Sequence, residues 1–183
     1  MKFRTEIEIA PLVEGLEHDA KIFALGSCFA ENISERLAKA KFSVTTNPFG
    51  VLFNPLSIAN AIERLDDTRA FGVCDIKAGR ENFFSFDAHS SLDGKTQTEA
   101  FANLNRAVAQ GSKALHEADW VILTFGTAWI YEKEGRVVAN CHKQPAKEFE
   151  RRRLSVAEIV ERYDALFEGV LRDKKVVLTV SPV

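Results

Sequence analysis

The sequence has no long apolar stretch. No run approaches the roughly 18 apolar residues that a helix needs to cross a bilayer, and residues 1–6 (MKFRTE) lack the apolar core of a secretory signal. Both absences argue against a membrane protein and against export. We therefore expect a cytoplasmic protein that does not engage a membrane.

The chain also lacks an excess of positive charge. It carries 24 Lys and Arg against 26 Asp and Glu, for a net charge of −2, so no broad basic field exists to attract nucleic acid or anionic lipid. The one basic cluster, residues 151–153 (RRR), directly precedes a helix signal and is expected to be a solvated helix entrance rather than a phosphate clamp. Nucleic acid is not an expected partner, and the sequence indicates no oligomeric state.

Cysteines and cofactor motifs are equally sparse. Cys28, Cys74 and Cys141 are an odd number of cysteines without Cys-x-x-Cys spacing, which argues against a disulfide framework and against structural zinc. Cys28, Cys141 and His142 could be read as a metal triad, but adjacent Cys and His side chains rarely reach the same ion, and a fourth ligand is not evident. Neither Gly-x-Gly-x-x-Gly nor the phosphate-loop lysine pattern occurs. We expect neither a metal nor a cofactor.

What the sequence does contain is an alternation of short apolar runs with amphipathic segments, in a length that suits one domain spanning residues 1–183. Strands are predicted where a brief apolar or β-branched run stops at a turn, and helices where apolar residues recur with a 3.6-residue period. The predicted strands cover residues 21–25, 42–46, 119–125 and 176–180, and the predicted helices cover residues 30–40, 55–65, 99–117 and 155–170. Residues 129–131 and 136–138 predict a β-hairpin, and residues 66–100 predict a loop with one or two short strands.

Strands that alternate with helices predict an α/β fold with a mainly parallel, doubly wound sheet, because parallel neighbours need crossover connections and helices supply them. In such sheets, ligands bind beyond the carboxyl ends of the strands. The turns expected there are residues 26–28, 47–50, 126–129 and 181–182, each rich in small or polar residues. We expect these turns to share one rim of the sheet.

The Gly26-Ser27-Cys28 turn holds two candidate nucleophiles. Cys28 opens a helix, so its sulfur is expected near unpaired backbone N–H groups and the positive end of the helix dipole, which favours the nucleophilic thiolate. Ser27 is the alternative, although a hydroxyl gains less from the dipole and needs a base nearby. An interpretation without chemistry makes Cys28 a small buried hydrophobe and Ser27 a helix cap.

Four histidines are available as bases. His18, His89 and His116 accompany charged or polar residues and are expected to be solvated. His142 differs, because it follows the predicted hairpin in the polar segment 140–143 (NCHK), at the end of the sheet where the turns gather. Both a structural and a catalytic role remain open for it.

Five blocks of this sequence together resemble the signature of the bacterial GSCFA family. They are residues 26–33 (GSCFAENI), 46–55 (TNPFGVLFNP), 125–129 (FGTAW), 140–143 (NCHK) and 179–183 (TVSPV). The blocks occur in order and cover most of the chain. The family is similar to the SGNH, or GDSL-like, hydrolases, a flavodoxin-like α/β group of esterases and acyltransferases. That resemblance implies the same doubly wound sheet that the residue pattern predicts.

The resemblance also implies roles for the residues of the first two blocks. In the larger group the first block reads Gly-Asp-Ser with the serine as nucleophile, which implies Cys28 as the nucleophile here and Ser27 as the runner-up. The second block of that group contributes a glycine N–H to the oxyanion hole. Gly50 is the similar position in this chain, in a turn that begins at Asn47.

The third and last blocks depart from the larger group. Its Gly-x-Asn-Asp is replaced by Gly126, Thr127 and two further residues without an Asn, so that Thr127 or Asn140 would have to supply this oxyanion donor. Its Asp-x-x-His would lie beyond Val183. The chain is therefore interpreted as a domain truncated at its C-terminus, or as one in which His142 acts as the base.

The expected function is hydrolysis or transfer of an acyl ester carried by a small molecule or a carbohydrate. The alternative is a non-catalytic module that keeps the same pocket for a carbohydrate or acyl ligand.

Overall fold

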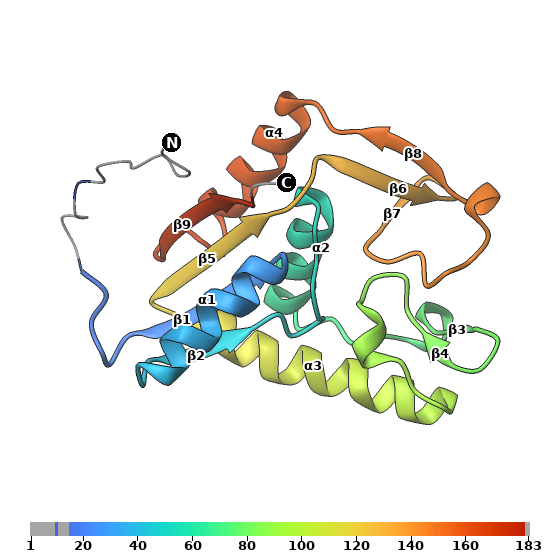
Figure 1. Ribbon diagram of the computed structural model, residues 1–183, viewed down its shortest axis with the longest axis horizontal. Coiled ribbons are helices and arrows are strands. Elements are labelled where there is room, and N and C mark those ends of the chain that lie inside the picture. The colour runs from blue at the N-terminus through green and yellow to red at the C-terminus, as the bar shows by residue number, and fades with distance from the viewer. Residues whose placement is uncertain (1–9, 11–14, 182–183) are drawn as a thin grey trace, which may run out of the picture.

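The computed structural model describes residue 10 and residues 15–181, and its elements alternate along the chain as the sequence predicts. Figure 1 shows them in order. The helices are α1 (Cys28–Lys39), α2 (Pro55–Asp66), α3 (Gln97–Glu117) and α4 (Val156–Glu168). The strands are β1 (Lys21–Gly26), β2 (Ser43–Thr46), β3 (Lys77–Ala78), β4 (Phe83–Phe84), β5 (Trp120–Phe125), β6 (Trp129–Lys133), β7 (Arg136–Val138), β8 (Glu150–Arg153) and β9 (Lys175–Val180).

The central sheet has four strands in the order β2-β1-β5-β9. All three pairings are parallel, with Ile22 of β1 opposite Val44 of β2 and Trp120 of β5. The strands therefore end on the same edge of the sheet, and the turns after them gather there. The fold is a flavodoxin-like α/β fold, which confirms the prediction of a doubly wound parallel sheet.

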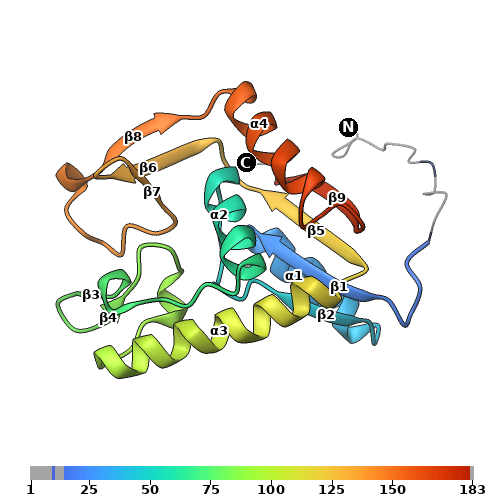
Figure 2. The ribbon, with the colours of Figure 1, turned by 180° about the vertical axis from the view of Figure 1, so that it is seen from behind.

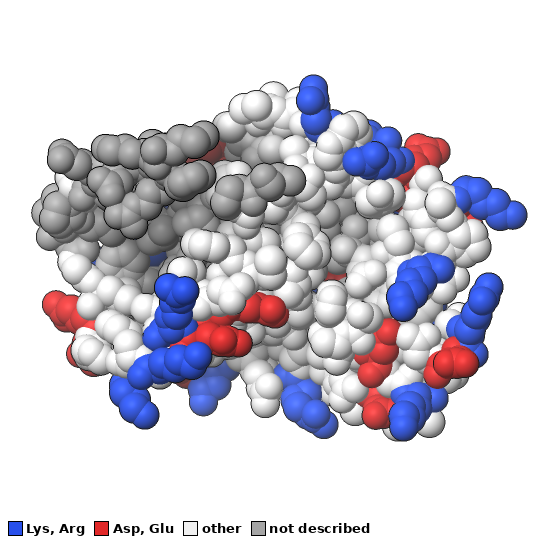
Figure 3. Space-filling model, in the orientation of Figure 1, with Lys and Arg blue, Asp and Glu red and all other residues white. Residues whose placement is uncertain are grey.

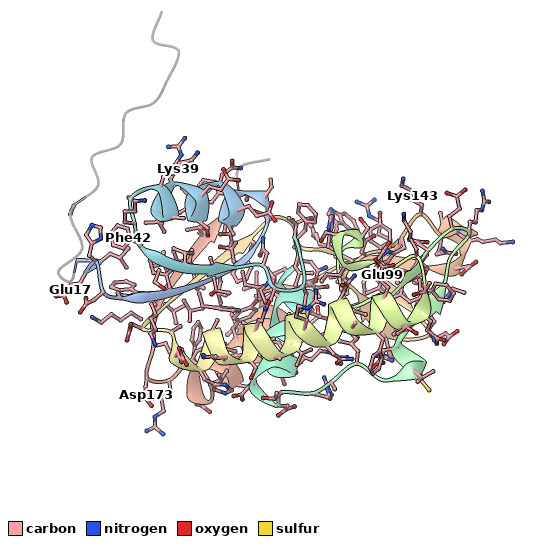
Figure 4. All side chains as sticks on the ribbon, turned by 90° about the horizontal axis from the view of Figure 1, so that it is seen from below. Glu17, Lys39, Phe42, Glu99, Lys143 and Asp173 are labelled. Carbon is pink, nitrogen blue, oxygen red and sulfur yellow. The ribbon has the colours of Figure 1, made fainter. Side chains whose placement is uncertain are left out.

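Helices cover both faces of this sheet. Leu37 of α1 packs with Ile22 and Trp120 on one face, while α2, α3 and α4 lie on the other face (Figures 2 and 4). The larger core lies on that second face, where Phe23 and Leu123 of the strands are fully buried. The same core contains the buried helical residues Ile58, Ile62, Leu65, Leu104, Leu115 and Leu166.

Each helix begins at a polar cap in the sequence. The caps are the side chains of Ser27, Asn54, Thr96 and Ser155, each of which accepts a hydrogen bond from a backbone N–H in the first turn of its helix. Pro55 follows Asn54 at the first helical position, as predicted. The cap at Ser27 starts α1 at Cys28, two residues before the predicted start at residue 30.

A second sheet lies beyond the carboxyl end of β5 and contains β7, β6 and β8 in that order, all antiparallel. The hairpin of β6 and β7 confirms the prediction for residues 129–131 and 136–138. The prediction for residues 151–153 is wrong, because they form β8 and not a helix entrance. Alternation along β8 turns Arg152 toward Glu132 and Glu158, and these two ion pairs hold the strand against the hairpin and α4.

The segment before α3 contains two short paired strands, β3 and β4, as expected for residues 66–100. α3 is the longest helix of the described chain, with 21 residues, and it is amphipathic. In the described part of the protein, no helix combines the length and the apolar character needed to cross a membrane.

Candidate functional site

The turn after β1 can be made only by glycine at its first position. Gly26 has a φ of +142°, and a side chain there would collide with the backbone carbonyl oxygen of Thr124 on β5. The close approach serves the sheet, because the Ser27 N–H donates to that same oxygen at 3.0 Å. Gly26 thus ends β1 and starts the switch into α1.

Ser27 is enclosed at this switch. Its side chain is only 1% exposed. Its hydroxyl accepts a hydrogen bond from the N–H of Phe29 at 3.3 Å and shares a second one with the hydroxyl of Ser181, just after β9, at 2.6 Å. Ser27 therefore caps α1 and joins the carboxyl ends of β1 and β9.

Cys28 lies on the open side of the same turn. It is the first residue of α1, and its side chain is exposed and unpaired. Its backbone N–H finds no acceptor within residues 15–181. An exposed sulfur thus sits beside an unused backbone donor, at the positive end of a 12-residue helix.

The second turn contacts the first through Asn47. The side-chain oxygen of Asn47 accepts a hydrogen bond from the N–H of Gly26 at 2.8 Å, so Asn47 is brought to the candidate site. Gly50 closes this turn with a φ of +73°, and its N–H donates to the Asn47 carbonyl oxygen at 2.7 Å. The backbone donor of Gly50 is therefore used within the turn. His89 packs directly on Gly50, a contact that no sequence signal indicated.

The third turn lies against Ser27. A methyl group placed on Gly126 would be 3.4 Å from the Ser27 Cβ. The N–H groups of Gly126 and Thr127 both donate to the carbonyl oxygen of Phe53, at 2.8 and 3.1 Å. The Thr127 hydroxyl accepts from the N–H of Trp129 at 3.1 Å. Both residues are brought to the rim, with their backbone donors engaged.

His142 belongs to the loop after β7 and packs in a separate cluster against the segment that begins at β4. Its side chain is 2% exposed and stacks on Phe84 with ring centroids 4.2 Å apart. Its Nε2 lies 2.9 Å from the carbonyl oxygen of Ser85 and 3.0 Å from that of Ala88, so Nε2 carries the proton and donates to both. Its Nδ1 lies 3.5 Å from the Asp93 carboxylate.

This cluster does not reach the turn, and among the described residues the buried Nδ1 of His142 has no hydrogen-bond partner. Asn140 accepts the backbone N–H of His142 through its side-chain oxygen at 2.8 Å, which shapes the loop. Burial raises the pKa of Asp93. Within the described chain, no hydrogen bond, ion pair or ring contact connects Asn140 or His142 with Ser27 or Cys28.

The described residues hold no metal-binding cluster, and a cavity of the protein lies away from the turn. In the described residues, no group of three or more His, Cys, Asp and Glu side chains could hold a metal ion. Burial raises the pKa of the Cys141 thiol. A cavity of about 660 Å³ lies between α2 and α4, where Arg64, Asp87 and Arg162 line it. Neither Ser27 nor Cys28 lines that cavity.

One contributor to the site was not predicted as a functional residue. Ser181 belongs to the last block of the sequence and to a turn expected at the rim, but only the structure reveals its hydrogen bond with Ser27. The two residues are 154 positions apart. The polar turn after β9 was the one signal that could have suggested the contact.

These features define a doubly wound α/β protein with a candidate site in the β1–α1 turn, on the carboxyl edge of its parallel sheet. The family model of the GSCFA family matches residues 21–183, and the chain belongs to this family. No curated protein and no solved structure matches the chain.

Proposed function

We propose that this protein hydrolyses or transfers an acyl ester, with Cys28 as the nucleophile. The observation that carries the proposal is the contrast between the two neighbours in the turn. Cys28 is exposed at the N-terminus of α1, beside its own unused backbone N–H. Ser27 is buried, and its hydroxyl is engaged with Phe29 and Ser181.

The chemistry follows from this placement. The Cys28 thiolate attacks the ester carbonyl carbon, and the carbonyl oxygen becomes an oxyanion that accepts a hydrogen bond from the Cys28 N–H. Collapse of the intermediate breaks the ester bond and forms a thioester with Cys28. The leaving alkoxide takes a proton from solvent. Water, or the hydroxyl of an acceptor, then attacks the thioester, returns the thiolate and releases the acid or the new ester.

Ser27 is the runner-up nucleophile, and in the leading proposal it positions Cys28. Its cap fixes the first turn of α1, and its hydrogen bond with Ser181 fixes that turn against the end of β9. The backbone donors of Gly50, Gly126 and Thr127 are engaged within the rim. Their use as oxyanion donors would require these hydrogen bonds to open. Asn140 lies in the His142 cluster, where its side-chain oxygen accepts the N–H of His142. The Cys28 N–H is therefore the principal donor in the proposal.

The test uses the full chain with a chromogenic short-chain acyl ester. Cys28→Ala should reduce the rate at least about a hundredfold, since it removes the attacking atom. Cys74→Ala is the matched control, because Cys74 is also an exposed free cysteine but lies far along the chain from the turn. Mass spectrometry of the reacted protein should find a hydroxylamine-labile acyl group on the peptide that contains Cys28.

Two outcomes would contradict this assignment. Full activity in Cys28→Ala excludes Cys28 as the nucleophile. If Ser27→Ala then abolishes activity while α1 stays intact by circular dichroism, the runner-up is correct. An acyl group on any peptide other than residues 27–28 would place the chemistry elsewhere.

The second candidate function is a non-catalytic module that binds a carbohydrate or acyl ligand. One observation favours it: among the described residues, no histidine is hydrogen-bonded to Ser27 or Cys28. A ligand that raises the melting temperature without being consumed would support this alternative. Turnover that depends on Cys28 would exclude it.

We also propose that the protein acts in the cytoplasm as one domain. The three cysteines are unpaired, which suits a compartment that keeps thiols reduced. Cell fractionation with an antibody against the native protein tests the location.

A further inference from the structure

The second sheet has an open face with an unusual composition. Trp129 and Tyr131 alternate along β6 on one side of the sheet, and Arg153 and Arg151 lie directly opposite them on β8. These four residues are called the aromatic face below. Trp129 and Tyr131 are each 42% exposed, so the face presents two large rings to solvent.

The opposite face of the same strands contains a buried isoleucine and an arginine that is paired with carboxylates. Ile130 has no exposed surface, and the guanidinium of Arg152 binds the carboxylates of Glu132 and Glu158. Arg152 thus has a structural role, and these two carboxylates neutralise its charge. The three consecutive arginines of β8 therefore divide by strand alternation into one inner and two outer residues.

The two outer arginines keep their charge available. The guanidinium carbon of Arg151 lies 4.1 Å from the centroid of the Trp129 ring and 5.9 Å from that of Tyr131. Neither Arg151 nor Arg153 forms an ion pair with an acidic residue in the described part of the chain. Stacking on a ring holds a guanidinium in place while its N–H edges stay open to solvent. Figure 3 shows Lys and Arg side chains over the region of β6 and β8, at the upper right.

The aromatic face begins beside the candidate site. Gly126 lies against Ser27, and three residues later the chain reaches Trp129, which is hydrogen-bonded to Thr127. Three residues span at most about 10 Å. The aromatic face therefore begins within about 10 Å of the Gly126 backbone, which lies against Ser27.

We propose that the aromatic face binds a saccharide chain that bears carboxylate groups. Ring C–H bonds of a sugar carry a small positive charge and pack against the negative face of Tyr131 and against the part of the Trp129 ring that Arg151 leaves exposed. Carboxylates on the chain match the planar donor forks of Arg151 and Arg153, which favour two parallel hydrogen bonds to one carboxylate. The idea that this saccharide carries the acyl ester rests on the proposed function. The idea that it binds to the aromatic face does not.

Charge and shape favour a saccharide over a nucleic acid. Binding to a nucleic acid requires many phosphate contacts along a basic surface, whereas this face offers two free guanidinium groups on a protein with a net charge of −2. Open rings on a flat sheet, flanked by a few fixed donors, suit a ligand that combines apolar ring faces with isolated anionic groups.

The test is a binding measurement with the full chain carrying Cys28→Ala, so that no turnover is needed. Isothermal titration calorimetry compares a short oligogalacturonate, a neutral maltooligosaccharide of the same length and a single-stranded RNA oligonucleotide. We expect the oligogalacturonate to bind most tightly, with an affinity that falls as salt is added. Trp129→Ala should weaken binding at least about tenfold, since a stacking ring is a typical hot spot. Trp129→Phe keeps an aromatic ring at this position and should retain most of the binding affinity.

The charge part of the proposal has its own matched pair. Arg151→Gln should weaken oligogalacturonate binding and leave the neutral saccharide unaffected, whereas Arg172→Gln removes the same charge from an exposed site elsewhere and should change neither.

The proposal is overturned if oligogalacturonate fails to bind, if Trp129→Ala and Arg151→Gln bind it as the parent does, or if RNA binds more tightly. Dimerisation that depends on Trp129 would overturn it too, because the face would then be an interface between copies. Because binding is read without turnover, failure of the Cys28 mechanism leaves this result interpretable.

Discussion

Replacing His142 by alanine tests whether this histidine holds the fold together or acts in catalysis. The substitution removes a donor that serves the carbonyl oxygens of Ser85 and Ala88, at 2.9 and 3.0 Å. The Ala88 oxygen loses its partner, whereas the Ser85 oxygen keeps only a longer hydrogen bond from the Ala88 N–H, at 3.3 Å. It also removes a ring stacked on Phe84. The side chain is 2% exposed, so water does not readily replace what is lost.

The expected cost can be assembled from these parts. Two lost hydrogen bonds contribute about 1 kcal/mol each, the aromatic stack about 1 kcal/mol, and the lost apolar burial up to about 1 kcal/mol. The free energy of unfolding should therefore fall by about 3–4 kcal/mol. For a chain of this size, that change lowers the melting temperature by roughly 6–16 °C.

Urea denaturation followed by circular dichroism measures this difference. His18→Ala is the matched control, because His18 also stacks on a phenylalanine, Phe42, but is exposed. The free energy of unfolding of His18→Ala should fall by less than about 1 kcal/mol. A His142→Ala protein as stable as the control would refute the structural role. If that stable variant had also lost esterase activity, His142 would act as the catalytic base.

Three further predictions concern backbone and charge. Gly26→Ala should lower the free energy of unfolding, measured by thermal denaturation, by at least about 3 kcal/mol, because its φ of +142° and the Thr124 carbonyl leave no room for a methyl group. Gly135→Ala, with open space around it, should cost about 1 kcal/mol. Equal losses of stability in the two variants would contradict the packing argument. Burial raises the pKa of Asp93 above its ordinary 3.8, so the stability that Asp93 contributes is present below pH 3.8 and is lost as pH rises through the raised pKa. Urea titrations at several pH values should find Asp93→Asn free of this loss. Parallel stability-against-pH curves for the parent and the variant would refute the prediction. Hydrogen bonds from the helix cap Ser155 and from the guanidinium of Arg152 lower the pKa of Glu158 from 4.5 to about 2. The stability that Glu158 contributes is therefore lost as pH falls between these values, and Glu158→Gln should lack that acid-dependent loss.

The fold could be predicted from local signals because most of its elements carry their own. Apolar runs that stop at Gly26 and Gly126 indicate buried strands, and Asn54-Pro55 and Ser155 indicate helix starts. The strand at residues 150–153 has no such signal. Three arginines in a row offer no apolar alternation, and what makes them a strand is pairing with β6, some 20 residues earlier in the chain, together with the ion pairs of Arg152.

The candidate site could be located but not resolved. Gly26 and the small residues after it indicate a tight turn at the carboxyl end of a buried strand, and ligand sites form at that edge of such sheets. The contacts that decide which groups are free are long-range: Gly26 with Asn47, Ser27 with Ser181, and Gly126 with Phe53. Turn composition cannot reveal whether a backbone donor is free or already bonded.

The same limit explains why the nucleophile could not be chosen between two adjacent residues. A residue at a helix cap turns its side chain back onto the backbone, whereas the next residue directs its side chain away from the axis. Ser27 meets the first description, with two hydrogen bonds and 1% exposure, whereas attack requires an ester carbonyl to approach the nucleophile to roughly 3–3.5 Å. The Cys28 sulfur is open to that approach. Cys28→Ser is therefore the sharpest single variant: it keeps an oxygen nucleophile at the exposed position, and residual activity there, with none in Cys28→Ala, would assign the reaction to position 28 independently of sulfur chemistry.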